Sequence, residues 1–318
     1  MNNLLEDRFR GCLLGLAVGD ALGAPVEFSK RYTYELRGME AGGPFNLKAG
    51  QWTDDTSMAL CLASSLLRGS FDAKGQMDQY VSWYKHGHWS STGKCFDIGA
   101  TTTAALEAYI KTGDAERSGQ PGEGNGALMR LAPAILWAYP DESMVITAAR
   151  LSTGYTHASA VCRDASVVLA TVIYRALRGD LPDCALLIPL EVVLDLRTVQ
   201  IRNIAEGSFA RKDEGEIRST GWAVHTLEAA LWAVHGAENF KGALLRAVNL
   251  GGDTDTIGAV TGQIAGALWG ESGIPPEWLE VLTMKKEIAD IAMRFVERVP
   301  EQGGTTEVNP SEESANGR

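Results

Sequence analysis

The stretch NLGGDTDTIGAVTGQIAGALWG, residues 249–270, holds the two patterns that decide the fold. Glycine recurs at every fourth position of its apolar part: Gly258, Gly262, Gly266 and Gly270. Residues four apart share one face of a helix, so these glycines form a stripe without side chains. Because each glycine inside a helix costs about 1 kcal/mol relative to alanine, the stripe indicates a helix that packs closely against another backbone.

A second glycine ladder with the same spacing lies near the N-terminus: Gly11, Gly15, Gly19 and Gly23. Stripes of small residues also occur in membrane helices. Here Asp20, Gln263 and the short apolar runs argue against a membrane span. We therefore expect two central helices in close contact, which would bring Asp20 near residues 253–256. The alternative is that the glycines have no packing role.

Apolar residues at three- and four-residue spacings predict helices along most of the chain. The expected helices are 5–22, 55–68, 97–111, 126–138, 142–151, 158–178, 220–235, 239–248, 255–269 and 283–297. Alternating strand patterns are nearly absent, and only residues 186–196 are ambiguous. We expect an all-α fold, a single compact multi-helix domain over residues 1–300. Residues 301–318 have few apolar side chains and are expected to form a disordered tail.

The composition excludes some functions. The net charge of −11 argues against binding nucleic acid or an anionic membrane through a general positive field. The chain has five scattered cysteines: Cys12, Cys61, Cys95, Cys162 and Cys184. They form no CxxC pair, and the N-terminus lacks a basic signal-peptide region, so we expect buried thiols in a cytoplasmic protein. A zinc cluster of His86, His88 and Cys95 fits no standard ligand spacing.

The second decisive pattern is a pair of oxygen-rich segments, TDDT at residues 53–56 and DTDT at residues 253–256. Each precedes an expected helix, and the simplest interpretation is helix capping, because Asp and Thr are good N-caps. Capping, however, requires one side chain, whereas each segment supplies two carboxylates and two hydroxyl groups. A further role for the additional carboxylates is therefore worth considering.

If the two segments meet in space, four carboxylates share a small volume: Asp54, Asp55, Asp253 and Asp255. Like charges so close cannot all remain ionised without compensation, and neither segment contains a basic residue. Divalent cations would supply that compensation, and oxygen ligands favour magnesium, manganese or calcium over zinc. Four carboxylates exceed what one magnesium ion usually binds, so the pattern predicts two ions.

Two other interpretations of DTDT fit less well. An EF-hand loop starting at Asp253 needs a glutamate at its twelfth position, where the chain has Ile264. A phosphatase DxDx(T/V) motif would follow a strand, but the preceding LLRAVNLGG is typical of a helix that ends at a glycine. The fifth position of the motif, which should be Thr or Val, is Ile257 in this chain. The phosphatase remains a minor alternative, with Asp253 as the nucleophile.

Six motifs together resemble one known family: GCLLGLAVGDALGAPVEF, WTDDTSMAL, FDIGATTTAAL, GNGALMR, LSTGYTHASA and NLGGDTDTIGAVTGQIAGALWG. In this order they are similar to the ADP-ribosylglycohydrolases, which include the dinitrogenase reductase-activating glycohydrolases and the ADP-ribosylarginine and ADP-ribosylserine hydrolases. The resemblance extends to about residue 298. It implies an all-α fold, a binuclear site for two Mg²⁺ or Mn²⁺, and hydrolysis of the bond between ADP-ribose and a modified side chain.

The resemblance also implies roles for individual residues. The implied metal ligands are Thr53, Asp54, Asp55, Asp253, Asp255 and Thr256. Glu27 in APVEF and Asp97 in FDIG match acidic residues near the metals and the scissile ribose, and with Asp55 and Asp255 they form the implied catalytic set. The implied substrate-binding residues are Gly122, Gly124, Asn125, Gly126, His157 and Trp222. His225 departs from the family, which often has an acid at this position.

The glycine loop has a physical rationale of its own. Small residues let backbone N–H groups approach a phosphate, and a helix starting at about Ala127 would add a favourable dipole. The expected ligands are ADP-ribose and an ADP-ribosylated protein, and we expect a monomer. Arginine is the first choice of acceptor, because FDIGATT is closest to the arginine-acting bacterial branch. Serine, acyl and base linkages, or a non-catalytic ADP-ribose-binding relative, are the alternatives.

Overall fold

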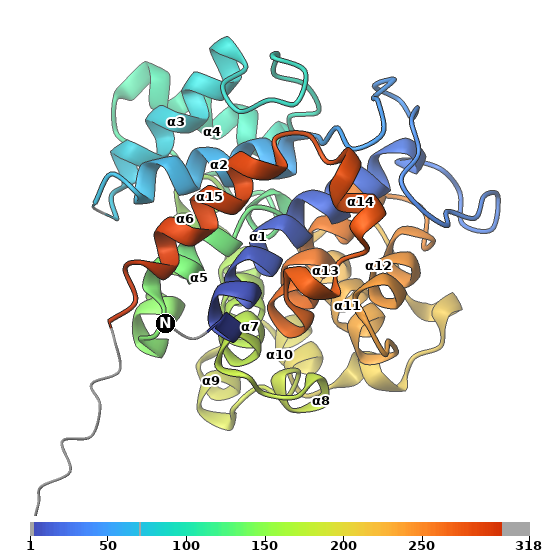
Figure 1. Cartoon of the computed structure of the whole chain (residues 1–318). Helices are drawn as coiled ribbons and strands as arrows, with labels where there is room; N and C mark the ends of the chain where they lie inside the picture. Colours follow the sequence, from blue (N-terminus) through green and yellow to red (C-terminus); the bar gives the residue numbers. More distant parts are fainter. Residues whose placement is uncertain (1–2, 70, 301–318) are drawn as a thin grey trace, which may run out of the picture.

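The computed structural model describes residues 3–69 and 71–300, and these are organised almost entirely as helices (Figure 1). The α-helices are α1 (Asn3–Gly23), α2 (Asp54–Leu66), α3 (Ala73–His86), α4 (Ala100–Thr112), α5 (Ala132–Ala138), α6 (Glu142–Gly154), α7 (Ala160–Arg178), α8 (Pro182–Ala185), α9 (Leu190–Asp195), α10 (Val199–Ala205), α11 (Ala223–His235), α12 (Phe240–Val248), α13 (Thr254–Trp269), α14 (Pro276–Val281) and α15 (Lys285–Val296). Five 3₁₀ turns connect them: η1 (Ala24–Val26), η2 (Asn125–Ala127), η3 (Ser208–Arg211), η4 (Glu214–Glu216) and η5 (Glu271–Gly273). No strand forms in the described ranges, which confirms the all-α prediction.

Helices α1 and α13 run side by side through the middle of the molecule (Figure 1). A Cβ atom on Gly15 would lie less than 3.0 Å from the carbonyl oxygen of Gly262, and one on Gly262 would lie as close to that of Gly15. The same holds for Gly19 against Gly258. The two ladders therefore face each other along antiparallel helices, and the packing role expected for the glycines is confirmed.

The segment Asn3–Val26 is long and apolar enough to cross a membrane by length and composition. In the structure, 89% of the 18-residue apolar window within this segment is buried inside the protein. Its neighbours include α13 and α15, so it has the surroundings of a central core helix.

Some expected boundaries were wrong. Helix α3 (Ala73–His86) was not expected, although Asp72 caps its first turn by accepting a hydrogen bond from the Gly75 N–H at 2.6 Å. The ambiguous residues 186–196 contain the helix α9 and no strand. Residues 126–138 do not form one helix, because a 3₁₀ turn and a loop precede α5, which begins at Ala132 with Pro133 in its first turn.

The five cysteines are all free. Cys12, Cys61 and Cys162 are buried as expected, whereas Cys95 is half-buried and Cys184 is exposed. Cys184 lies in the short helix α8 at the molecular surface, so the expectation of a buried thiol was wrong there. The expected tail, residues 301–318, lies outside the described residues.

Candidate active site

The first turns of α2 and α13 meet beside the C-terminal end of α1, and this meeting point collects the acidic side chains. Asp20 of α1 accepts four hydrogen bonds from the start of α2. Its Oδ1 accepts from the Thr53 N–H at 2.9 Å and the Thr53 hydroxyl at 3.0 Å, and its Oδ2 accepts from the Thr56 N–H at 2.9 Å and the Thr56 hydroxyl at 2.7 Å. The glycine ladder brings Asp20 and the 253–256 segment together, as expected from the sequence.

The capping interpretation of TDDT and DTDT was wrong. Thr53 and Asp253 occupy the N-cap positions of α2 and α13, and neither side chain accepts a capping hydrogen bond. The Thr53 hydroxyl instead lies among three carboxylates: 3.0 Å from Asp20 Oδ1, 3.0 Å from Asp55 Oδ2 and 3.1 Å from Asp255 Oδ2. Side chains from the two segments, about 200 positions apart in sequence, are thus in direct contact.

Two groups of carboxylates have the geometry to hold a cation. Ligand oxygens of Asp20, Asp55 and Asp255 lie within 4.8 Å of one another, and so do those of Glu27, Asp253 and Asp255. Asp255 belongs to both groups. In these two groups, three buried oxygens have no hydrogen-bond partner among the residues that the structure describes: Glu27 Oε2, Asp55 Oδ1 and Asp255 Oδ1. Buried, unpartnered carboxylate oxygens on two groups that share a residue match the requirements of a pair of hard cations.

Electrostatics leads to the same conclusion. Burial raises the pKa of Asp54, Asp55 and Asp255 well above the usual value, and the neighbouring carboxylates raise it further. Burial and the charges of Asp97, Asp253 and Asp20 raise the pKa of Glu27 to about 9. The protein alone therefore does not neutralise this cluster, and protons or cations must do so.

The cluster opens into a cavity of about 290 Å³. Its walls include the carboxylates of Glu27, Asp54, Asp97, Asp253 and Asp255 and the hydroxyl-bearing Thr256. The same cavity is also lined by Gly124, Asn125, Gly126 and His157. The sequence segments expected to form the metal site and the ligand loop thus line one common space.

Isolated bridges fix the loop that contains Gly124 and Asn125. Gln120 pairs with His157 and Gly124 pairs with Trp222, and the Asn125 N–H donates to the Gly221 carbonyl at 3.0 Å. The loop is therefore tied to His157 and to Trp222, two of the expected substrate-binding residues.

Comparison with known proteins identifies the family. A family model described as ADP-ribosylglycohydrolase matches residues 1–305. The chain belongs to the ADP-ribosylglycohydrolase family. It is therefore an enzyme that hydrolyses a glycosidic bond, as the sequence motifs implied.

Several members of the family are similar to this chain over most of their own length. The chain is 40% identical to the ADP-ribosylarginine hydrolase Tri1 of Pseudomonas putida (strain GB-1), over 93% of this chain and 79% of the relative. It is 32% identical to the ADP-ribosyl-[dinitrogen reductase] glycohydrolase of Rhodospirillum rubrum, over 89% and 92%. A solved structure titled "ADP-ribosylglycohydrolase-related protein complex" superposes with a TM-score of 0.82 at 42% identity, covering 93% of this chain and 99% of that chain.

The structure of this ADP-ribosylglycohydrolase changes the expected environment of two loop residues. Gly122 does not line the cavity and packs against the Thr101 side chain. The Asn125 amide is engaged within the protein: Nδ2 donates to Asp253 Oδ2 at 2.7 Å and to Thr226 Oγ1 at 2.9 Å. Asn125 therefore connects the loop to an acid of the cluster. The loop leads into a 3₁₀ turn, so the expected helix dipole at Ala127 is absent.

Trp222 lines a neighbouring cavity of about 520 Å³ with His225, Lys212 and Arg218. Its indole Nε1 donates to Glu123 Oε2 at 2.9 Å, and the His225 ring packs edge-on against it with centroids 4.7 Å apart. The tryptophan is thus beside the acid-lined cavity and is not part of its wall.

Some residues around the acid cluster of this protein were given no functional role from the sequence. Asp20 was expected nearby but was given no role, although a carboxylate in a glycine-rich, apolar helix is itself a signal. Phe28 and Thr101 also line the cavity. Phe28 is 67% exposed with a left-handed φ of 62°, a conformation that is unusual for a bulky residue and that sequence reasoning did not anticipate.

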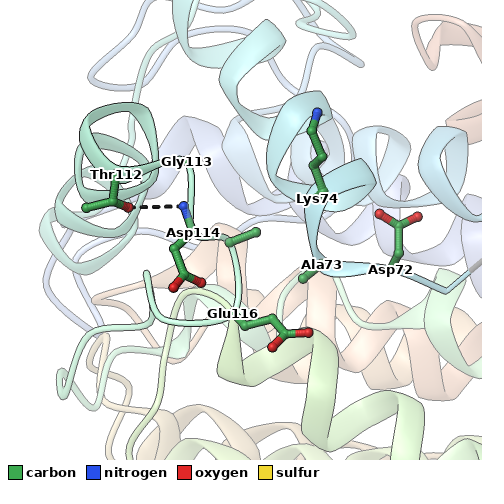
Figure 2. A pocket seen from close by; sticks show the side chains of 8 residues that line it. Asp72, Ala73, Lys74, Thr112, Gly113, Asp114 and Glu116 are labelled. Carbon is green, nitrogen blue, oxygen red and sulfur yellow. Dashed lines mark hydrogen bonds between the residues drawn. The ribbon is translucent and has the colours of Figure 1, made fainter.

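Other candidate sites do not have comparable geometry. A surface hollow of about 440 Å³ contains Asp72, Lys74, Asp114 and Glu116, but these side chains point in different directions (Figure 2). Asp72, Lys74 and Glu116 are exposed. Within residues 3–69 and 71–300, His86, His88 and Cys95 form no metal-ligand group, and no strand precedes Asp253 as a phosphatase motif requires. The zinc and phosphatase alternatives are therefore not supported.

Proposed function

We propose that this enzyme hydrolyses the N-glycosidic bond between ADP-ribose and a modified arginine side chain, and that it requires two divalent cations, Mg²⁺ or Mn²⁺. The observation that supports this most strongly is the pair of carboxylate groups that share Asp255, a residue that lines the cavity. The same cavity is lined by the glycine loop, which a diphosphate could approach. The arrangement thus joins a cation site to an anion-accepting wall.

The proposed ligands of the two ions are Thr53, Asp54, Asp55, Asp253, Asp255 and Thr256. Asp20 and Glu27 lie close enough to contribute, since each belongs to one of the two carboxylate groups. When bound, the ions would neutralise these carboxylates and lower the pKa of a water molecule. All donors are oxygen atoms, which favours magnesium or manganese over zinc.

The acids at the cavity wall would complete the proton transfers. Hydrolysis joins a water oxygen to the anomeric carbon, breaks the carbon–nitrogen bond, and delivers one water proton to the departing guanidine. In the cation-free protein, burial and nearby carboxylates raise the pKa of Asp97 to about 7, so burial favours a carboxyl group that can carry a proton. We assign the leaving-group side to Asp97, and assign to Glu27 the positioning of the ribose hydroxyls.

Arginine is the proposed acceptor because similar proteins from Pseudomonas putida and Serratia proteamaculans, 40% and 39% identical, are named ADP-ribosylarginine hydrolases. A substrate panel tests the choice. The purified protein is given arginine-, serine- and base-linked ADP-ribose, each with magnesium, manganese or chelator. Release of ADP-ribose from the arginine linkage only, and only with a cation, is expected.

A pair of variants separates the loss of the shared carboxylate, Asp255, from the loss of one negative charge anywhere on the protein. We expect Asp255→Asn to remain folded and to lose at least about a hundredfold in activity, because the substitution removes the one carboxylate that both cation-binding groups share. Asp290→Asn removes an exposed acid and should have wild-type activity. Full activity of Asp255→Asn in chelator would reject the cation-dependent mechanism, and a preference for the serine linkage would reject arginine.

A further inference from the structure

Arg130, the last residue of the GNGALMR motif, is buried, with 1% of its surface exposed. A buried guanidinium group usually pairs with a carboxylate, but the oxygen acceptors around Arg130 are neutral. Its Nε donates to the Tyr80 hydroxyl at 3.0 Å, and the group lies over the Tyr80 ring, 4.7 Å from the centroid. Nη1 donates to the Gly126 carbonyl and Nη2 donates to the Thr156 hydroxyl. One side chain thus holds both the glycine loop and the residue before His157.

The hydroxyl of Thr156 has only one proton to donate. Arg130 cannot accept a hydrogen bond, so the Thr156 oxygen is the acceptor in their contact. The same oxygen lies 2.9 Å from His157 Nδ1. Thr156 is fully buried, and its proton would lack an acceptor if Nδ1 carried a hydrogen. The hydroxyl therefore donates to Nδ1, which leaves the second ring nitrogen, Nε2, as the protonated one.

The free edge of the His157 ring faces the cavity. A Cβ atom built on Gly126 would lie 3.3 Å from Nε2, and one built on Gly124 would lie 3.7 Å from it. No hydrogen bond in the described part of the chain uses Nε2. Burial and the charge of Arg130 also lower the pKa of His157 to about 3, so the ring is neutral. A neutral ring can offer a directed N–H group to a ligand only if its tautomer is fixed.

We propose that Arg130 and Thr156 are positioning residues that fix His157 as the Nε2–H tautomer, so that it donates a hydrogen bond to a phosphate oxygen of the ligand beside Gly124 and Gly126. The ligand's identity rests on the proposed function, but the tautomer does not. The contribution of the relay is to binding, because its hydrogen bond is made beside Gly124 and Gly126 and His157 is not one of the reacting acids. Loss of the relay should therefore raise KM and leave kcat nearly unchanged.

The test compares Thr156→Val, which keeps the shape and removes the hydroxyl group, with Thr156→Ser, which keeps the hydroxyl group. Histidine labelled with ¹⁵N reports the tautomer by NMR in the ligand-free protein, and the spectrum of His157→Gln assigns the signal. We expect protonated Nε2 in the wild type and Thr156→Ser, and a mixture of tautomers in Thr156→Val. Circular dichroism verifies that each variant is folded.

Binding supplies the second readout. Thr156→Val should raise KM, and the Kd for ADP-ribose, about tenfold with kcat within about twofold, as expected for weakening one hydrogen bond to a charged group. Thr156→Ser should restore wild-type values. An Nδ1–H tautomer in the wild type, or unchanged tautomer and affinity in Thr156→Val, would overturn the inference. Wild-type protein with protonated Nε2 that binds no ADP-ribose would support the tautomer relay and contradict the proposed function.

Discussion

Asp20 shows at the residue scale how one buried carboxylate organises the site. Its Oδ2 accepts from the N–H of Thr56, the third residue of α2, which is the donor that an N-cap side chain normally satisfies. Because Asp20 of α1 performs this capping, the side chain of Thr53 at the N-cap position is not used for it. The Thr53 hydroxyl instead contacts Asp55 and Asp255 of the cluster. Burial raises the pKa of Asp20 to about 6, while its hydrogen bonds oppose that rise.

Replacement of Asp20 by Asn tests this arrangement. One carboxylate oxygen becomes an NH₂ group that faces a backbone N–H, so at least one of the four hydrogen bonds is replaced by a contact between two donors. We expect Asp20→Asn to lower the free energy of unfolding by about 1–3 kcal/mol, measured by urea denaturation. Asp290→Asn, on the surface, is the control and should change it by less than about 0.5 kcal/mol. Equal stability of the two variants would show that Asp20 does not anchor α2.

At the scale of helices, the glycine ladders set the distance between α1 and α13. Each glycine of one helix lies against backbone atoms of the other, so no side chain separates the two axes. The close approach places the first turn of α13 beside Gly23, where the Thr254 hydroxyl donates to the Gly23 carbonyl at 2.9 Å. The position of Asp255 thus depends on the ladder.

Alanine substitutions within two helices should have effects of opposite sign. A Cβ atom on Gly262 would overlap the carbonyl oxygen of Gly15, so we expect Gly262→Ala to destabilise the protein by about 3 kcal/mol or more. At Gly242 of α12, the nearest atoms to a Cβ are 3.5 and 3.8 Å away. There, alanine should stabilise by up to about 1 kcal/mol through its helix propensity. Thermal unfolding measures both, and tolerance of alanine at Gly262 would contradict the close packing.

The sequence predicted the elements that carry strong local patterns. The spacing of the glycines predicted the α1–α13 contact. Convergence of the two acidic segments was a hypothesis from their composition, and the contact of Thr53 with Asp255 confirms it. Helix α3 was missed because Gly75 and its polar neighbours weaken the apolar pattern of Ala73–His86. The engagement of Asn125 with Asp253 and Thr226 could not be predicted, because it depends on three segments brought together only by the fold.

At the scale of the whole molecule, the acid cluster makes stability depend on pH. Burial and neighbouring charges raise the pKa of Glu27 from 4.5 to about 9 and that of Asp97 from 3.8 to about 7. The folded protein therefore binds more protons than the unfolded chain between pH about 4 and 9, and stability falls as pH rises through that window. This dependence is opposite in sign to that of carboxylates stabilised by salt bridges.

The expected result is a melting temperature that decreases from pH 5 to pH 9 in chelator. Magnesium should raise the melting temperature, and by more at pH 8 than at pH 5, because ionised carboxylates bind the cation and protonated ones do not. Differential scanning fluorimetry over this range provides the measurement. A magnesium effect that is the same at both pH values would show that the cluster is not the binding site.

The most direct measurement of the central claim is anomalous X-ray diffraction at the manganese edge from crystals grown with Mn²⁺. We predict two manganese peaks in one cavity, one against Asp20, Asp55 and Asp255 and the other against Glu27, Asp253 and Asp255. No peak at either group, or manganese bound only elsewhere on the surface, would contradict the account.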